Sequence, residues 1–270
     1  MIAVDHLSLA FSAPAGSNLI LSDLCFTIAA GEFVALMGPN GSGKTSLARC
    51  LNGILLPSAG EVFVEGLNTK NPRDLIEIRR RVGLVFQNPD NQIVAPTVER
   101  EIAFGLENLA VPRPEMHARV EEMLERFELI ALRTRAPHEL SGGEKQRVAL
   151  AGVMAMQPRY LILDEPTSLL DYPSRVRLFE ILAALRRARA EAGEQLAVLL
   201  ISQFSEEALF ADRLIVLHQG RIVMDGYPKE ILQRVEELAQ IGLQSPLEFR
   251  VQQALLQKDK IIPLEDLMLE

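Results

Sequence analysis

The sequence contains only two cysteines, no long apolar run and no excess of positive charge. Cys25 and Cys50 lack the spacing of a metal or redox motif and lie in apolar stretches, so we expect both to be small core residues in a reducing compartment. Residues 196–201 form one of the longest apolar runs, far short of the roughly 18–20 residues of a membrane span. The N-terminus lacks the basic region and cleavage pattern of a signal peptide. We therefore expect a soluble, intracellular chain.

Positive charge is scarce along the whole chain. The 28 lysines and arginines are outnumbered by 36 aspartates and glutamates, which gives a formal net charge of −8. Proteins that bind nucleic acid through its phosphates usually carry a basic excess, so we expect no nucleic-acid partner. An anionic ligand must instead be held by a local site. Hydrophobic residues make up 48% of the 270 residues and charged residues 24%, which excludes a disordered or collagen-like chain.

Short apolar runs alternate with helical patterns, which predicts an α/β fold with a mainly parallel sheet core. The first 36 residues and residues 61–66 alternate between apolar and polar positions, and this pattern predicts an additional antiparallel β subdomain. The expected buried strands of the core are residues 33–37, 82–86, 160–163, 196–201 and 214–217.

Two segments have a mostly helical pattern. Residues 88–157 are expected to form a helical subdomain inserted into the sheet order, where Met116, Val120, Met123, Leu124 and Phe127 fall at helical spacing. Residues 228–270 are expected to form a short C-terminal helical appendage, with breaks at Gly242, Pro246 and Pro263.

The strongest motif is GPNGSGKT at residues 38–45, which follows a predicted strand, precedes a predicted helix and matches G-x-x-x-x-G-K-[ST]. Its glycines let the backbone point N–H groups at phosphate oxygens, and the helix N-terminus adds partial positive charge. Lys44 is expected to reach the β- and γ-phosphates and Thr45 to ligate Mg²⁺. The expected phosphate-binding residues are Gly38, Pro39, Asn40, Gly41, Ser42, Gly43, Lys44, Thr45 and Ser46.

A second motif, YLILDE at residues 160–165, is an apolar strand that ends in two carboxylates. Asp164 is expected beside the metal, through a water, and Glu165 is expected to polarise an attacking water as general base. A buried strand with an acidic end is common by itself. The phosphate loop makes the catalytic interpretation the stronger one.

A third motif, LSGGEKQR at residues 140–147, precedes an apolar helical stretch. Ser141 as N-cap and Glu144 three residues later form a capping box, and the N–H groups of Gly142 and Gly143 offer a second anion site. From local physics alone, a well-capped helix is the preferred interpretation. One triphosphate does not need two such sites, unless the second serves the nucleotide of another molecule.

Together, these three motifs resemble those of the ATP-binding-cassette (ABC) ATPases, in the same order and at similar separation. The resemblance implies a P-loop NTPase fold with ATP and Mg²⁺ as cofactors. Phe11 stands where the family places an aromatic ring on adenine, and Gln87 where a glutamine touches Mg²⁺ and signals to the membrane partner. Residues 168–171, which end in Asp171, resemble the loop that reaches across the dimer. The implied catalytic residues are Glu165, Gln203 and Lys44, and the implied metal-binding residues are Thr45, Gln87 and Asp164.

Residues 82–109, above all FQNPDNQ at 86–92, resemble the energy-coupling-factor transporter ATPases, which include those once grouped with cobalt and nickel uptake. The resemblance implies an ABC ATPase domain at residues 1–227 and an importer of a vitamin or a transition-metal ion. It also implies a head-to-tail dimer with a second ABC ATPase, a copy or a sibling, in which residues 38–45 of one subunit face residues 141–144 of the other. The other implied partners are an integral membrane coupling protein and a small substrate-binding membrane subunit, at the cytoplasmic face of the membrane.

Two positions depart from the family pattern. Gln203 replaces the switch histidine, and its amide can donate a hydrogen bond but cannot become cationic or relay a proton. Glu144 replaces a glutamine and adds negative charge near a polyphosphate, so we expect weaker nucleotide-driven closure. These departures leave a low-turnover nucleotide-sensing cassette open as an alternative. The ATPase of another ABC importer is a second alternative. A cassette that acts on DNA or ribosomes is disfavoured because the chain has no coiled-coil insertion and no second cassette.

Overall fold

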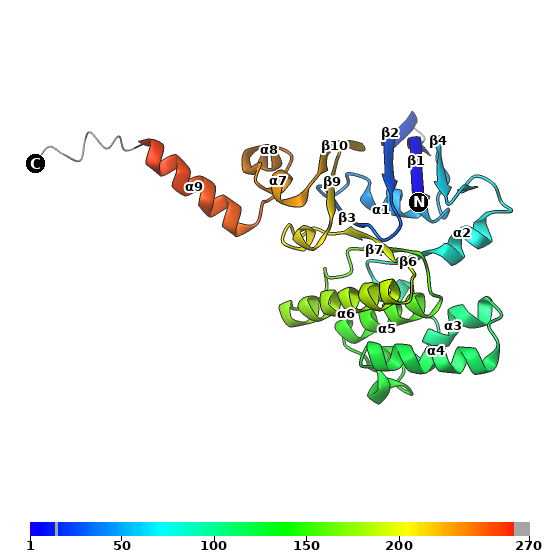
Figure 1. The fold of residues 1–270 in the computed structure, drawn as a ribbon. Coiled ribbons are helices and arrows are strands. Elements are labelled where there is room, and N and C mark those ends of the chain that lie inside the picture. Colours follow the sequence, from blue (N-terminus) through cyan, green and yellow to red (C-terminus); the bar gives the residue numbers. More distant parts are fainter. Residues whose placement is uncertain (14–15, 262–270) are drawn as a thin grey trace, which may run out of the picture.

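The structure, a computed structural model, describes residues 1–13 and 16–261 and contains two β-sheets flanked by helices (Figure 1). The smaller sheet is antiparallel, with strand order β2-β1-β4-β5. Its strands are β1 (Ile2–Ala13), β2 (Gly16–Ile28), β4 (Ala59–Val64) and β5 (Leu67–Asn68). This confirms the predicted antiparallel β subdomain.

The larger sheet has the order β10-β9-β3-β8-β7-β6 and is parallel except for its edge strand β10. Its strands are β3 (Phe33–Met37), β6 (Val82–Val85), β7 (Tyr160–Asp164), β8 (Ala197–Ile201), β9 (Arg213–His218) and β10 (Arg221–Gly226). The first five of these are the predicted core strands, so the mainly parallel α/β core is confirmed.

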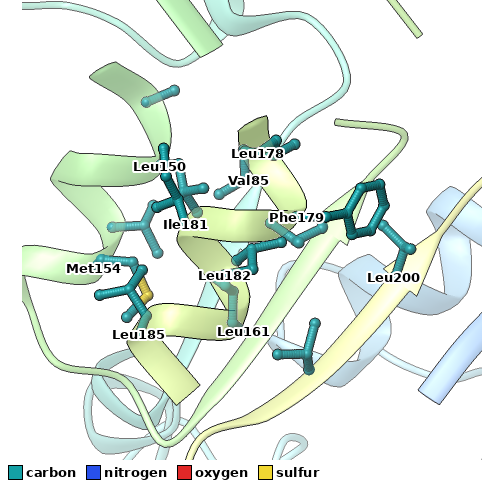
Figure 2. Packing of buried hydrophobic residues seen from close by; sticks show 14 of the residues in the cluster. Val85, Leu150, Met154, Leu161, Leu178, Phe179, Ile181, Leu182, Leu185 and Leu200 are labelled. Atoms are coloured by element: carbon teal, nitrogen blue, oxygen red, sulfur yellow. The ribbon is translucent and has the colours of Figure 1, made fainter. Parts of the chain in front are cut away.

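Each core strand is buried on both faces, because its side chains alternate between two hydrophobic clusters. In β3, Ala35 and Met37 belong to one cluster, whereas Val34 and Leu36 belong to the other. The first cluster also contains apolar side chains of α5 (Gly142–Ala155) and α6 (Tyr172–Glu191). In Figure 2 they pack against side chains of β6, β7 and β8. The second cluster joins the sheet to β1, β2, β4, α1 (Lys44–Leu51) and α2 (Leu75–Arg81).

The chain between β6 and β7 is helical, as predicted. It forms α3 (Val98–Asn108), α4 (Arg113–Arg126) and α5, which pack on one another below the sheet in Figure 1. The apolar positions predicted at helical spacing in and after α4 are the inward-facing ones: Val120, Met123, Leu124 and Phe127 are buried and Met116 packs against them. They fill the first core cluster.

The C-terminal part is also helical, with α7 (Pro228–Leu232), α8 (Val235–Gln240) and α9 (Leu247–Ile261). The predicted breaks at Gly242 and Pro246 fall between α8 and α9, and the break predicted at Pro263 lies outside the described residues. α9 projects away from the sheets in Figure 1. Among residues 1–13 and 16–261, every helix is either too short or too polar to cross a membrane.

The prediction for the two cysteines is right for Cys50 and wrong for Cys25. Cys50 is fully buried in α1, and burial raises the pKa of its thiol to about 12. Cys25 is exposed. Its neighbours Leu24 and Phe26 point into the core, so strand alternation directs Cys25 to the outer face of the small sheet. The prediction relied on the apolar residues around Cys25 and did not take this alternation into account.

Candidate functional site

The predicted site residues follow the carboxyl ends of four parallel strands. Gly38 follows β3, Gln87 follows β6, Glu165 follows β7 and Gln203 follows β8. Since β3, β8, β7 and β6 are neighbours in this order, their carboxyl ends meet at one sheet edge. In α/β folds this is the edge at which ligands bind.

The glycine-rich loop after β3 forms the floor of a cavity of about 280 Å³. Lys44 is 5% exposed and its Nζ donates to the carbonyl oxygens of Gly38, at 2.8 Å, and Pro39, at 3.1 Å. Burial lowers the pKa of this ammonium group, and the carboxylates of Glu165 and Asp164 oppose that shift. The cavity is lined by Ile20, Asn40, Gly41, Gly43, Lys44, Thr45, Ser46 and Glu165.

The loop fits a phosphate group in its backbone as well as its charge. The Ser42 hydroxyl oxygen is buried without a hydrogen-bond partner, which an incoming acceptor would satisfy. Gly43 has φ +104°, and a Cβ there would lie 2.6 Å from Leu21 Cδ2. At Gly38, a Cβ would lie 2.1 Å from the carbonyl oxygen of Leu217, so only glycine lets β3 pass this close to β9 before it turns.

Replacing Gly38 by Ala is expected to lower the free energy of unfolding by about 1–3 kcal/mol, because overpacking against a backbone atom forces the loop to shift. Gly142→Ala is the matched control: a Cβ there meets nothing closer than 3.9 Å, and Ala favours the first turn of α5. Thermal and urea unfolding of both variants measures the effect. Equal stability of Gly38→Ala and the parent would show that the loop accommodates the methyl group.

Thr45 and Asp164 offer oxygen ligands for a metal ion. Thr45 Oγ1 donates to Asp164 Oδ1 at 3.1 Å, and Asp164 is 3% exposed. Burial raises the pKa of the Asp164 carboxyl, and the hydrogen bond from Thr45 opposes the shift. Beside a nucleotide, Mg²⁺ takes oxygen ligands such as a hydroxyl and a carboxylate and keeps several waters, so Thr45 and Asp164 fit the predicted ion.

Glu165 is held by both predicted glutamines. Its Oε2 accepts from Gln87 Nε2, at 2.8 Å, and from Gln203 Nε2, at 2.6 Å. The residue is 7% exposed and has φ +49°, an unusual value for a non-glycine residue, while its N–H donates to the carbonyl of Ile201 at 3.0 Å. Such strain is found where a side chain must be aimed. The sequence indicated three separate roles; the structure adds that the three side chains form one hydrogen-bonded unit.

The start of α5 has the predicted capping box. Ser141 N–H and Oγ–H donate to Glu144 Oε2, at 2.7 and 2.8 Å, and Glu144 N–H donates to Ser141 Oγ at 3.3 Å. Two hydrogen bonds lower the pKa of Glu144 from its ordinary value. The one from the Ser141 backbone has the larger effect, and the one from the Ser141 hydroxyl comes second. Ser141 and Gly142 are exposed, and residues 141–144 do not line the cavity above Lys44.

The comparisons with known proteins decide the family. Residues 21–168 match the ABC transporter family. The chain is 48% identical over 229 residues to the energy-coupling factor transporter ATP-binding protein EcfA1 of Symbiobacterium thermophilum, a match that covers 85% of this chain and 78% of that protein. This chain belongs to the ABC transporter family. It is an ATP-binding, ATP-hydrolysing cassette of the energy-coupling factor type.

Two solved cassettes have the same fold. One is cbiO1 from Clostridium perfringens, part of the ABC transporter complex cbiONQ, with 30% identity, a TM-score of 0.76 and coverage of 93% of this chain and 98% of that chain. The other is the ATP-binding cassette MJ0796, a dimer bound to ADP and Pi, with 28% identity and a TM-score of 0.76 over 84% of this chain and 99% of that chain. The P-loop NTPase fold of the cassette is therefore established.

Two further predicted residues, Phe11 and Asp171, lie on exposed parts of the cassette. Phe11 is 45% exposed on the β1–β2 hairpin, where it pairs with Asn18, and its role at adenine stays a prediction. Asp171 caps α6 by accepting from the Ser174 N–H at 3.0 Å, and hydrogen bonds from Ser174 lower its pKa. Both are exposed and available to a second molecule.

Sequence reasoning missed a buried acid in the cassette. Glu207 is 5% exposed, and its Oε2 accepts from Ser202 Oγ, at 2.6 Å, and from Thr167 Oγ1, at 3.0 Å. Burial raises the pKa of its carboxyl. These hydrogen bonds join Thr167, in the loop after β7, to Ser202, in the loop after β8. The same two loops carry Glu165 and Gln203. No local pattern distinguishes Glu207 from the surface acid beside it, Glu206.

Proposed function

We propose that this cassette energises an energy-coupling-factor-type membrane importer of a vitamin or a transition-metal ion, through ATP-driven head-to-tail closure of a dimer. The observation that carries the proposal is the division of its anion sites. The loop at residues 38–45 lines a cavity, whereas residues 141–144 at the helix start line none of it, and Ser141 and Gly142 among them are exposed. One chain thus presents two half-sites that a second chain can complete.

The surface around the second half-site supports a protein partner. A Cβ on Gly142 would lie 3.9 Å from the Leu169 carbonyl, so the start of α5 adjoins the loop after β7. On that loop, Leu169 is 65% exposed, and Tyr172, the first residue of α6, is 78% exposed. Exposed apolar side chains beside a capped helix start are typical of an interaction site. The dimeric state of the similar cassette MJ0796 agrees with this arrangement.

The chemistry divides among the residues as their contacts suggest. When bound, ATP with Mg²⁺ supplies the electrophilic phosphorus and the charge of the metal. Lys44 and the loop N–H groups would hold phosphate oxygens, and Thr45 and Asp164 would hold the ion. The Glu165 carboxylate, held through Oε2, would take a proton from water at Oε1. Gln87, bound to that carboxylate and exposed, would report its state to the membrane partner.

Replacing Gln203 by His is expected to raise the turnover number about tenfold, because an imidazole can donate to Glu165 as the amide does and can also become cationic and relay a proton. Steady-state phosphate release in the presence of Mg²⁺ measures the change. Gln195→His, at an exposed position just before β8, is the control. A Gln203→His variant no faster than the parent would show that the glutamine is a competent substitute, and would remove the case for a low-turnover cassette.

Affinity purification of the tagged cassette from detergent-solubilised membranes of its native host tests the transport proposal. We expect a polytopic membrane protein and a small membrane subunit in the eluate, and the small subunit would point to the transported substrate. A second cassette ATPase would establish a heterodimer. Recovery of soluble partners alone, in repeated preparations, would overturn the importer and its location at the cytoplasmic face of the membrane, while leaving the ATP site intact.

A further inference from the structure

A second group of chemically active side chains lies on the outer face of the small sheet, and none of its members lines the ATP cavity. It consists of Asp5 and His6 on β1 and Asp23 and Cys25 on β2, all exposed. β1 and β2 lie side by side at the upper right of Figure 1. None of the roles proposed for the cassette uses these four residues.

A β-bulge brings these side chains together. Val4 pairs with Phe26 and Leu7 with Leu24, so Asp5 and His6 on β1 stand opposite the single residue Cys25 on β2. In a regular strand, two consecutive side chains would point to opposite faces of the sheet. His6 has φ +48°, and Asp23, on the facing strand, has φ +55°. The chain holds both non-glycine residues in the left-handed region, and their side chains meet.

The contacts orient three donor atoms for one ion. His6 Nδ1 lies 2.6 Å from Asp23 Oδ1, and because a carboxylate only accepts, Nδ1 carries the proton, so that Nε2 is the lone-pair donor of the neutral imidazole. His6 Nε2 is 3.9 Å from Asp5 Oδ1. The backbone N–H of His6 donates to Cys25 Sγ at 3.2 Å, which fixes the sulfur beside the imidazole-bearing residue. One ligand atom each from Asp5, His6 and Cys25 lie within 4.8 Å of one another.

We propose that Asp5, His6 and Cys25 form a binding site for Zn²⁺, with Asp23 as the carboxylate that orients the imidazole. Thiolate, imidazole and carboxylate are the ligands that zinc prefers, and bonds of about 2.0–2.3 Å place tetrahedral ligands about 3.3–3.8 Å apart. Small rotations of exposed side chains reach this spacing from the one observed. Three protein ligands leave the fourth position to water. The ion would join β1 to β2 in the hairpin that carries Phe11.

Protection of Cys25 from alkylation tests the site on the intact, nucleotide-free cassette. Cys50, the only other cysteine, is fully buried, so the native protein reports Cys25 alone. Equimolar Zn²⁺ is expected to slow the reaction of Cys25 with iodoacetamide at least tenfold, whereas Mg²⁺, which prefers oxygen ligands, is expected to leave it unchanged. Calorimetric titration should give one Zn²⁺ for each chain.

Variants separate a built site from a lone reactive thiol. His6→Asn tolerates the left-handed backbone but removes the imidazole ligand, and it should abolish the protection by Zn²⁺. Asp23→Asn should weaken zinc binding about 10–100-fold, as loss of an orienting carboxylate does. His117→Ala, at an exposed position on α4, is the matched control and should behave as the parent. Full protection in His6→Asn, or no protection in the parent, would overturn the proposal; unchanged circular dichroism establishes that the variants are folded.

Discussion

Replacing Glu165 by Gln is expected to lower ATP turnover by 10²–10⁴-fold and to leave ATP binding intact. The amide cannot accept a proton from water, and this is the step proposed for the carboxylate. The change is nearly isosteric, and the Gln oxygen can still accept from Gln87 and Gln203, whose amides bind Oε2 in the parent. Turnover is therefore lost without a disturbance of the loops that hold the residue.

The same variant tests dimer closure. If ATP closes the dimer and hydrolysis opens it, Glu165→Gln should accumulate as an ATP-bound dimer in size-exclusion chromatography. Glu230→Gln, an exposed position on α7, provides the control and should turn over and elute as the parent does. Phosphate release above a tenth of the parent rate would mean that another group accepts the proton, and the role given to Glu165 would be wrong.

Replacing Lys44 by Met is expected to weaken ATP binding about 10–100-fold. The Met side chain fills the same buried space but removes the only ammonium group among the residues that line the cavity. Charge-assisted hydrogen bonds contribute about 1.5–3 kcal/mol each, and every 1.4 kcal/mol is tenfold in Kd. Calorimetric titration with ATP and Mg²⁺ measures the loss.

The Lys44→Met variant needs a measurement of stability beside it, because Nζ also binds the carbonyls of Gly38 and Pro39. A melting temperature near that of the parent would assign the loss to the missing charge. Lys229→Ala, exposed on α7, should bind ATP as the parent does. An unchanged Kd for Lys44→Met would contradict the phosphate-binding role.

Local pattern was sufficient for most of the fold. The strands at 33–37 and 160–163 are short apolar runs, and they are found in β3 and β7, because a strand buried on both faces is apolar at nearly every position. The capping box at Ser141 was also predictable, since its hydrogen bonds close within one helical turn. The prediction that Cys25 is buried was wrong, because the face on which a strand residue lies depends on its position in the alternation of the strand. A run of apolar residues does not reveal that alternation.

For the candidate site, sequence motifs predict individual residues, whereas the hydrogen bonds between those residues could not be predicted. Glycine spacing and the order of the three motifs identify Lys44, Asp164 and Glu165, because a phosphate loop needs glycine at fixed places along one turn of chain. The two amide hydrogen bonds on Glu165 join residues 78 and 38 positions apart in the chain. Pairing over such distances is set by strand order, and strand order is a property of the whole sheet.

By itself, then, the sequence determined the five parallel strands of the core, but not the edge strand β10, and it determined which family the motifs resemble. Only the tertiary structure decided that Gln87 and Gln203 bind the same oxygen of Glu165, that Glu207 supports them from a buried position, and that a bulge gathers His6 and Cys25. The physical reason is range. Periodicity and capping act over a few residues, whereas hydrogen bonds between loops exist only after the sheet has placed distant strand ends side by side.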